Sequence, residues 1–401
     1  MPHLDPTDAL DLDDELDEVE RLIRDTVSAF VRDRVTDHVA EWFEAGTFPT
    51  SELAPELGKL GLLGMHLEGY GCAGASATAY GVACRELEAA DSGLRSFVSV
   101  QGSLVMFPIH RYGSKEQKQE WLPRLASGEA IGCFGLTEPD QGSDPGGMRT
   151  QAKRDGGGTS RSSGAESGGD WILNGTKMWI TNGSVADVAV VWARTEEGIR
   201  GFLVPKDTPG FTTGEIHRKL SLRASVTAEL HLEDVRLPHS AVLPGVTGLR
   251  GPLSCLSEAR FGILCGVVGA ARTCYLSALE YSTTREQFGR QIGGFQLTQE
   301  KLARMQVEFV RSQLLALRLS RLKDTGKLRP EQVSLGKLAN VRAALDIARS
   351  ARTVLGANGI TTEYPVLRHA NNLETVLTYE GTEEIHTLVV GESVTGLAAY
   401  R

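Results

Sequence analysis

Apolar residues recur at helical spacing in the first third of the chain. Near the N-terminus they follow a period of three to four residues through one stretch: Val19, Leu22, Ile23, Val27, Phe30 and Val31. Such a stripe is typical of a helix that packs one face against a core. The same pattern predicts helices over residues 51–60, 77–90 and 115–126, and Ser114 is a good cap for the last of them. Residues 1–130 therefore predict a helical domain.

The pattern changes to short β-rich runs in the middle of the chain. Residues 188–193, 201–204 and 229–232 are bounded by Gly, Pro, Asn or Asp, which is typical of strands. Residues 156–169 are mostly Gly and Ser and lack an apolar anchor, so we expect a disordered hairpin loop there. Residues 131–240 therefore predict a β-domain.

Long helical patterns return in the last part of the chain. They cover residues 253–284, 296–324, 330–356 and the stretch from 393 onward. The breaks at Gly326, at residues 356–359 and at Gly381 suit a bundle of four or five helices. The order of helices, strands and helices predicts an α+β chain, with a helical bundle at residues 241–401 as its third domain.

Composition excludes several classes of protein. The net charge of −9 and pI near 5.6 argue against a nucleic-acid partner, which requires surplus Lys and Arg. No uninterrupted apolar run approaches the length of a membrane span, and the acidic residues 1–20 are unlike a targeting peptide. The six cysteines form no CxxC pair, so we expect free thiols, no metal site and a cytoplasmic location, or the mitochondrial matrix if a transit peptide has been removed.

One glycine motif invites a nucleotide-binding interpretation. Residues 69–74 match GxGxxG, and Asp91 follows about twenty residues later. In a dinucleotide-binding fold the acidic residue ends a second strand, whereas Asp91 ends a predicted helix. We therefore interpret residues 69–74 as a glycine-rich turn.

Two segments of the predicted β-domain are suited to a flat ring or a pyrophosphate. Residues 134–144 are dense in glycines, hydroxyls and backbone donors, and residues 179–182 offer a tryptophan with a hydroxyl two residues later. Arg285 and Arg290 near a predicted helix end are natural partners for phosphate, although surface ion pairs explain them equally well. Taken singly, each segment is also compatible with an ordinary turn, strand or helix end.

Two charged residues are candidates for chemistry. Glu380 stands before a Gly-Thr step that breaks a helical pattern, and such a break lets a side chain face a ligand. Local chemistry alone does not separate it from the neighbouring acids Glu374, Glu383 and Glu384. Arg95 precedes a mostly apolar run, and a buried Arg needs an anion. That anion is either a substrate or one of the nearby acids Glu86, Glu88 and Asp91.

Taken in order, the motifs resemble the acyl-CoA dehydrogenase family from about residue 15 to the C-terminus. The motifs that carry the resemblance are CFGLTEP at 133–139, WITN at 179–182, REQFG at 285–289, LGANG at 355–359 and YEGT at 379–382. Within the family, residues 85–106 are most similar to the branch of glutaryl-CoA dehydrogenases. The loop at 219–225 and Thr395-Gly396 fit that branch as well.

The resemblance implies a homotetramer that binds FAD between subunits. It assigns the following residues to the cofactor: Phe134, Leu136, Thr137, Gly142, Ser143, Trp179, Ile180, Thr181, Arg285, Gln296, Leu355, Gly356, Thr382 and Glu384. Of these, Arg285, Gln296 and the segment 353–357 would come from a neighbouring subunit. An electron-transfer flavoprotein is the expected electron acceptor.

The resemblance also implies the reaction. Glu380 would remove the α-proton of an acyl-CoA while the β-hydride leaves for the flavin, and Glu380 would then return a proton after CO2 is lost. The expected reaction is oxidative decarboxylation of glutaryl-CoA to crotonyl-CoA and CO2. The alternative is dehydrogenation of another short or dicarboxylic acyl-CoA without decarboxylation. The residues assigned to the substrate are Arg95, Ser96, Ser99, Glu88, Ser143, Arg260, Tyr379 and Gly381.

Three departures from the branch pattern bear on specificity. Leu94 stands where an aromatic residue is expected beside Arg95, and Gly102 replaces an expected serine. Both leave the acyl-chain preference open. The insertion at residues 156–169 is expected to affect the docking of an electron acceptor rather than the chemistry.

Overall fold

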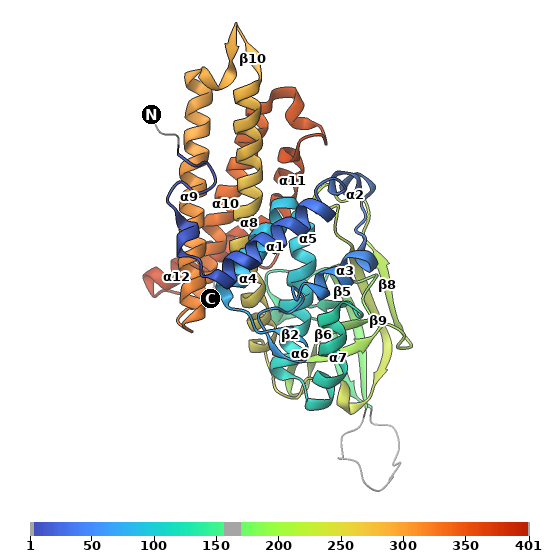
Figure 1. Cartoon of the computed structure of the whole chain (residues 1–401). Coiled ribbons are helices and arrows are strands. Elements are labelled where there is room, and N and C mark those ends of the chain that lie inside the picture. Colours follow the sequence, from blue (N-terminus) through green and yellow to red (C-terminus); the bar gives the residue numbers. More distant parts are fainter. Residues whose placement is uncertain (1–3, 156–169, 400–401) are drawn as a thin grey trace.

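The computed structural model describes residues 4–155 and 170–399, so the loop predicted at 156–169 lies outside the described residues. Helices form both the N-terminal and the C-terminal part of the chain. The segment between these parts in the sequence forms a β-sheet domain, which lies at one end of the molecule (Figure 1). The predicted fold class of helices, middle β-domain and helices is confirmed.

The N-terminal part is helical apart from one small hairpin. Its helices are α1 (Glu18–Arg34), α2 (Val39–Ala45), α3 (Thr50–Lys59), α4 (Ala77–Ala90), α5 (Ser92–Ser99), α6 (Phe107–Tyr112) and α7 (Lys115–Ser127), with a 3-10 turn η1 (Leu12–Glu15) and a π-helical segment η2 (Val100–Met106). The GxGxxG stretch forms the hairpin of β1 (Glu68–Gly69) and β2 (Cys72–Ala73), with Tyr70 at a φ of 53°. It is a turn between helices, and among the described residues β1 and β2 pair with each other, antiparallel, and are followed by α4 and α5 rather than by a strand parallel to them.

The middle part is a seven-stranded sheet. Its strands are β3 (Gly132–Gly135), β4 (Gln151–Arg154), β5 (Trp171–Thr181), β6 (Val188–Thr195), β7 (Gly198–Pro205), β8 (Phe211–Glu215) and β9 (Thr227–Leu237). The order is β3-β6-β4-β5-β9-β8, with β7 paired to β6. Pairing is antiparallel except where β6 runs parallel to β3 and β4.

The C-terminal part is a bundle of long helices. It comprises α8 (Arg250–Thr284), α9 (Gln296–Asp324), α10 (Pro330–Leu355), α11 (Pro365–Thr378) and α12 (Glu383–Thr395), with a hairpin of β10 (Glu286–Gln287) and β11 (Arg290–Gln291) joining α8 to α9. The last helix begins at Glu383 rather than at 393, because Thr382 caps it by accepting a hydrogen bond from the Ile385 amide.

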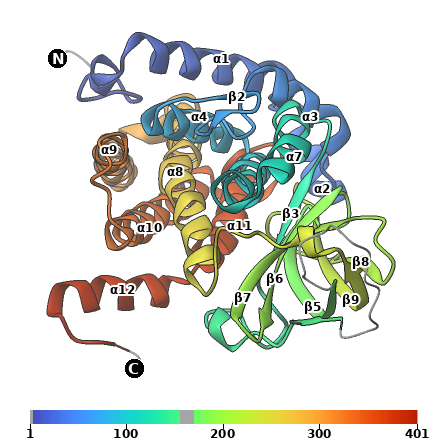
Figure 2. The ribbon, with the colours of Figure 1, turned by 90° about the horizontal axis from the view of Figure 1, so that it is seen from below.

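Helix α8 is the central helix of the molecule. Seen along the bundle, it is surrounded by α4, α9, α10 and α11, while α12 extends to one side (Figure 2). By length and composition α8 could cross a membrane, although none of its apolar runs is uninterrupted over that length. Of its most apolar window of 18 residues, 72% is buried inside the protein.

A buried network joins the three parts near the candidate site. The Asp91 carboxylate caps α5 by accepting from the Gly93 amide at 2.7 Å, and it also accepts from Arg368 at 2.5 Å and Asn372 at 2.9 Å, both on α11. Asn372 in turn accepts from the Leu222 amide, in the loop before β9, at 2.8 Å. These hydrogen bonds therefore fix the position of the helix that carries Arg95 relative to the helix that leads to Glu380.

Candidate active site

Glu380 lies in a strained turn between α11 and α12. Its φ is 54° and that of Gly381 is 97°, so two consecutive residues adopt left-handed backbone. This conformation costs a residue with a side chain on the order of 1–2 kcal/mol, and such outliers concentrate at functional sites. A residue with a side chain does not fit at position 381, since a Cβ added to Gly381 would lie 2.9 Å from His386 Nε2 and 3.2 Å from an Arg260 nitrogen.

Two cations hold the main chain of this turn. Lys337 Nζ on α10 donates to the carbonyls of Tyr379 at 2.7 Å and Gly381 at 2.8 Å. Arg260 Nε on α8 donates to the carbonyl of Glu380 at 2.6 Å. The helix ends here, so these carbonyls have no intrahelical partner, and the two cations satisfy them.

The Glu380 carboxylate itself is left largely unsatisfied. Its Oε2 atom is buried and accepts no hydrogen bond from the described residues. Burial raises the pKa of Glu380, against the opposing effect of the charges of Arg95, Lys337 and Arg260. A desolvated carboxyl with a raised pKa is suited to accept a proton near neutral pH.

Arg95 lies near Glu380, and Arg95 and its partner Glu88 are fully buried, whereas Tyr379 and Glu380 are half-buried. Its Nε donates to Glu88 Oε2 at 2.6 Å, and its Nη2 donates to the hydroxyl of Tyr379 at 2.5 Å. Burial alone would lower the pKa of Arg95, but the charge of Glu88 raises it well above its usual value. The described residues hydrogen-bond Nε and Nη2 of Arg95, which leaves Nη1 for a ligand.

Two of the three serines on α5, Ser96 and Ser99, differ in their surroundings. Ser96 Oγ lies 3.0 Å from the Tyr379 hydroxyl, and Ser99 Oγ is buried without a hydrogen-bond partner among the described residues. A buried hydroxyl without a partner is unusual and indicates a ligand or water. Both positions were predicted to bind substrate, and this prediction stays open.

The two segments predicted to bind the flavin lie together at one part of the sheet. The Met178 amide on β5 donates to the Thr137 carbonyl at 2.9 Å, and the buried Lys177 Nζ donates to Leu136 O at 3.0 Å and to the Glu138 carboxylate at 2.9 Å. Trp179 stands out from this frame with a φ of 63° and is 56% exposed. Phe134, Leu136 and Ile180 are buried, whereas Gly142 and Ser143 lie on an exposed loop.

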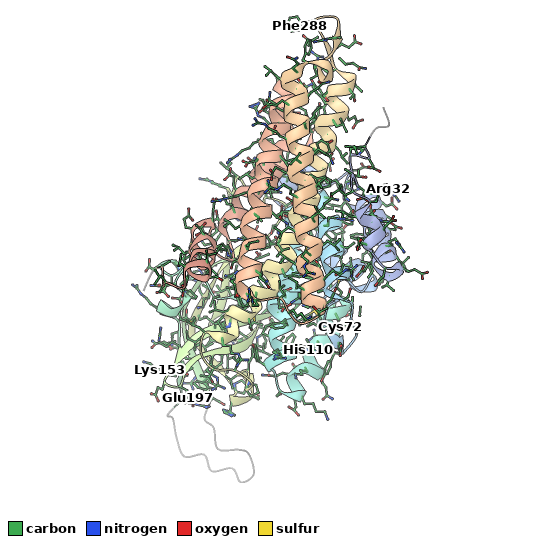
Figure 3. All side chains as sticks on the ribbon, turned by 90° about the vertical axis from the view of Figure 1, so that its left-hand side faces the viewer. Arg32, Cys72, His110, Lys153, Glu197 and Phe288 are labelled. Carbon is green, nitrogen blue, oxygen red and sulfur yellow. The ribbon has the colours of Figure 1, made fainter. Side chains whose placement is uncertain are left out.

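The remaining predicted cofactor residues lie away from this frame. Arg285 and Gln296 are exposed beside the β10–β11 hairpin, whose tip carries Phe288; Figure 3 places Phe288 and the β-domain residues Lys153 and Glu197 at opposite ends of the molecule. Leu355 and Gly356 lie near the same hairpin, because Asn358 donates to the Tyr281 hydroxyl at the end of α8 at 3.0 Å. Within one chain, these residues do not meet the segments of the sheet.

Two further predicted cofactor residues belong to the start of α12. Thr382 uses its hydroxyl as the helix cap, and Glu384 is exposed in the first turn. Both follow directly on the turn that carries Glu380.

Sequence reasoning missed three features of the site. Lys337 is 1% exposed and shares a helix face with Val333 and Val341, and this phase of α10 was the signal that could have identified it as a buried lysine. Gly266 lets α8 pass close to the Arg95–Glu88 ion pair, since a Cβ added at Gly266 would lie 2.2 Å from Glu88 Oε2. His386 is buried, and burial together with the charges of Lys337 and Arg260 lowers its pKa to about 3.

Comparison with known families decides the classification. The models described as acyl-CoA dehydrogenase N-terminal, middle and C-terminal domains match residues 17–129, 133–235 and 247–395, respectively. The chain belongs to the acyl-CoA dehydrogenase family. It is therefore an acyl-CoA dehydrogenase, as its motifs predicted.

Individual relatives point to two branches of this family. The chain is 37% identical over 395 residues to the human mitochondrial short-chain specific acyl-CoA dehydrogenase, covering 96% of this chain and 92% of that protein. It is 64% identical to glutaryl-CoA dehydrogenase from Mycobacterium smegmatis in a crystal structure that covers 100% of both chains with a TM-score of 0.95. A second structure of a glutaryl-CoA dehydrogenase from that organism, in complex with FADH2, is 63% identical, with a TM-score of 0.94 over 99% of both chains.

A metal site requires several His, Cys, Asp or Glu side chains close together. Within residues 4–155 and 170–399, no group of three or more His, Cys, Asp or Glu side chains is placed to hold a metal ion. The cysteines of the same residues are free thiols, and all but Cys72 are buried.

Proposed function

We propose that this chain oxidises glutaryl-CoA with FAD and releases crotonyl-CoA and CO2. The observation that carries the proposal is Arg95, a fully buried guanidinium beside the candidate base Glu380 that keeps one nitrogen open to a ligand. A buried arginine fork is suited to bind a carboxylate. The 64% identity to a glutaryl-CoA dehydrogenase supports the same substrate.

The balance of charge around Glu380 also favours a dicarboxylic acyl group. Among the described residues, three cations (Arg95, Arg260 and Lys337) surround two carboxylates (Glu88 and Glu380), which leaves a net charge of +1 when all are ionised. Burying an uncompensated charge is costly. A butyryl group would leave this charge in place, whereas the distal carboxylate of a glutaryl group neutralises it.

The residues at the sheet fit a flavin. Trp179 offers an exposed ring beside the backbone of residues 136–138, and the relative that contains FADH2 is similar over nearly the whole chain. Phe134, Leu136, Thr137, Trp179, Ile180 and Thr181 would hold it. When bound, FAD supplies the acceptor for the β-hydride of the substrate.

Glu380 would carry the protons. In the first half of the reaction its carboxylate takes the α-proton, and the Glu380 backbone N–H would hydrogen-bond the thioester oxygen as negative charge develops there. After oxidation, the bond between the γ-carbon and the distal carboxylate breaks and its electron pair enters the conjugated thioester. The protonated Glu380 then returns a proton to the γ-carbon, which gives crotonyl-CoA.

A second candidate function is dehydrogenation of a short-chain acyl-CoA without decarboxylation. The likeness to the short-chain specific enzyme favours it. The two candidates differ in what they require of Arg95, because a monocarboxylic acyl group has no distal charge to bind.

A double variant, Arg95→Gln with Glu88→Gln, tests this requirement. Removing both charges avoids leaving a buried carboxylate without its partner, which would cost about 3–5 kcal/mol. We expect kcat/KM for glutaryl-CoA to fall at least about 100-fold, because the loss of hydrogen bonds to a charged group removes roughly 3 kcal/mol of transition-state stabilisation. We expect kcat/KM for butyryl-CoA to fall less than about tenfold. Equal losses for the two substrates would show that Arg95 does not bind the distal carboxylate.

We further propose that the active protein is a homotetramer in which each flavin contacts two chains. Arg285 and Gln296 are exposed and flank the β10–β11 hairpin, and β10 lies at the end of the long helices away from the sheet of the same chain (Figure 1). A neighbouring chain that presents this end would complete the flavin site. An electron-transfer flavoprotein as acceptor, which the resemblance implies, and a cytoplasmic location complete the proposal.

A further inference from the structure

Lys337 is the buried group that family motifs and substrate chemistry leave without a role. It lies on the second turn of α10, is 1% exposed, and spans Glu380 by donating to the carbonyls on both sides of it. With Arg260 on the carbonyl of Glu380 itself, each of three consecutive carbonyls accepts a hydrogen bond from a cation. An amide or hydroxyl could satisfy carbonyls at lower desolvation cost, so the use of an ammonium group requires another reason.

The titratable groups near Lys337 come from five elements. Arg260 faces it from α8, Arg95 from α5 together with its partner Glu88 from α4, His386 from α12, and Tyr379 and Glu380 from the turn between α11 and α12. Glu88 is already paired with Arg95, and His386 is kept neutral by burial. Among the described residues, Glu380 is therefore the acid that remains to balance Lys337.

We propose that Lys337 is a positioning residue that serves as the counter-ion of Glu380 and fixes its left-handed backbone. The inference rests on the proposed function, in which Glu380 is the base. The two hydrogen bonds hold the turn, and the positive charge keeps the buried carboxyl ionised at the pH at which it must accept a proton. Arg260 shares the first task through the Glu380 carbonyl.

The proposal has a defined effect on pH dependence. Burial lowers the pKa of Lys337 to about 7, against the effect of Glu380, and burial raises the pKa of Glu380 against the effect of Lys337. Removal of the lysine charge takes away one of the interactions that favour the ionised carboxylate. The pKa of Glu380 then rises further, and proton abstraction is lost at a higher pH than in the wild type.

Hydrogen exchange at the α-carbon measures this step without the redox step. An acyl-CoA with sulfur in place of its β-carbon has no β-hydride to lose, so the FAD-loaded protein can only exchange its α-hydrogens with D2O, which proton NMR follows. In Lys337→Met, we expect the acidic midpoint of the exchange rate to rise by about one pH unit. The loss of rate would then be about tenfold greater at pH 6 than at pH 8.5.

Asn340→Leu is the matched control. Asn340 lies one turn further along α10, is equally buried, and donates to the carbonyls of Leu264 and Ser312, but it is uncharged and does not face the turn of Glu380. We expect a lower melting temperature for this variant and an unchanged midpoint. Lys337→Gln, which keeps a donor but no charge, provides the same comparison if Lys337→Met does not fold, and Lys337→Arg is expected to restore the wild-type midpoint.

The outcomes separate the inference from the function on which it rests. Wild-type exchange combined with an unchanged midpoint in Lys337→Met or Lys337→Gln overturns the role of Lys337 alone. A wild type that neither exchanges α-hydrogens nor bleaches its flavin with any acyl-CoA overturns the proposed function, and the inference with it. Exchange without release of CO2 from glutaryl-CoA overturns the substrate but leaves the role of Lys337 standing.

Discussion

Two carboxylates of this protein show how surroundings decide the role of a single residue. Glu138 accepts hydrogen bonds from the amides of Arg149 and Thr150 and from Lys177, so both of its carboxylate oxygens have partners. Glu380 has a buried oxygen that accepts no hydrogen bond from the described residues. The first arrangement stabilises a structure, whereas the second leaves a group that gains from taking a proton.

Glu138→Gln tests the structural role. Burial alone would raise the pKa of Glu138, but the hydrogen bonds from Thr150, Arg149 and Lys177 lower it to about 2. Because the folded pKa lies below the usual 4.5, the stabilisation is fully present above pH 4.5 and is lost as pH falls toward 2. We expect thermal or urea unfolding to show a loss of about 3–5 kcal/mol at pH 7, since Lys177 is left buried without its partner, and a smaller difference in acid.

The control for this prediction lies on the same loop. Asp140 pairs with Arg149 in solvent, so Asp140→Asn should change the free energy of unfolding by less than about 1 kcal/mol. If both variants lost the same stability, burial would not be the cause.

At the scale of elements, close contacts between helices fix the geometry of the site. Helix α8 passes the Arg95–Glu88 pair at Gly266, and α5, α11 and the loop before β9 meet at Asp91. Small residues and buried polar groups at these crossings set distances that no single helix could set by itself. A change at a crossing should therefore affect the substrate as well as stability.

Gly266→Ala tests this coupling. The added Cβ would lie 2.2 Å from Glu88 Oε2 and 3.2 Å from Arg95 Nε, so the ion pair must move. We expect a loss of about 1–3 kcal/mol of stability, as for other overpacked cores, and a larger loss of kcat/KM for glutaryl-CoA than for butyryl-CoA. Gly391→Ala on α12 is the control, because its Cβ meets nothing within 4 Å and should stabilise the helix by about 0.5–1 kcal/mol. If Gly266→Ala lowered kcat/KM equally for glutaryl-CoA and butyryl-CoA, the coupling would be contradicted.

The elements that the sequence predicted and those that it missed differ in how they are buried. Long helices such as α9 and α10 keep a polar face, so their period was visible. Residues 92–106, which form α5 and η2, are all buried, although α5 carries Ser92, Arg95, Ser96 and Ser99 at helical spacing, so this segment lacks the solvent-exposed polar face of an ordinary surface helix. The pairing of Arg95 with Tyr379 joins residues far apart in the chain, so only resemblance to a family could place them in one site.

At the scale of the whole molecule, one chain supplies only part of the proposed flavin site. The segments of the sheet and the hairpin beside Arg285 lie far apart (Figure 3). A chain that lacks its neighbour would keep Glu380 and Arg95 but would hold the cofactor weakly. Activity should then depend on assembly.

Complementation between two inactive variants tests this dependence. One chain carries Arg285→Ala with Gln296→Ala, and the other carries Glu380→Gln. If each flavin site takes its hairpin from a neighbour, mixed assemblies regain one intact site in two, and random association gives about a quarter of wild-type activity. Light scattering should report a tetramer. Activity no higher than the sum of the separate variants, or an active monomer, would contradict the shared site.

The fate of the distal carboxylate is the most direct test of the proposed reaction. The protein, loaded with FAD, is mixed without oxygen with glutaryl-CoA that carries 13C in its distal carboxylate, and flavin absorbance, released CO2 and the acyl-CoA product are measured together. We predict bleaching of the flavin, one labelled CO2 for each flavin reduced, and unlabelled crotonyl-CoA. Bleaching with butyryl-CoA but not with glutaryl-CoA, or labelled glutaconyl-CoA as the final product, would contradict the decarboxylating function.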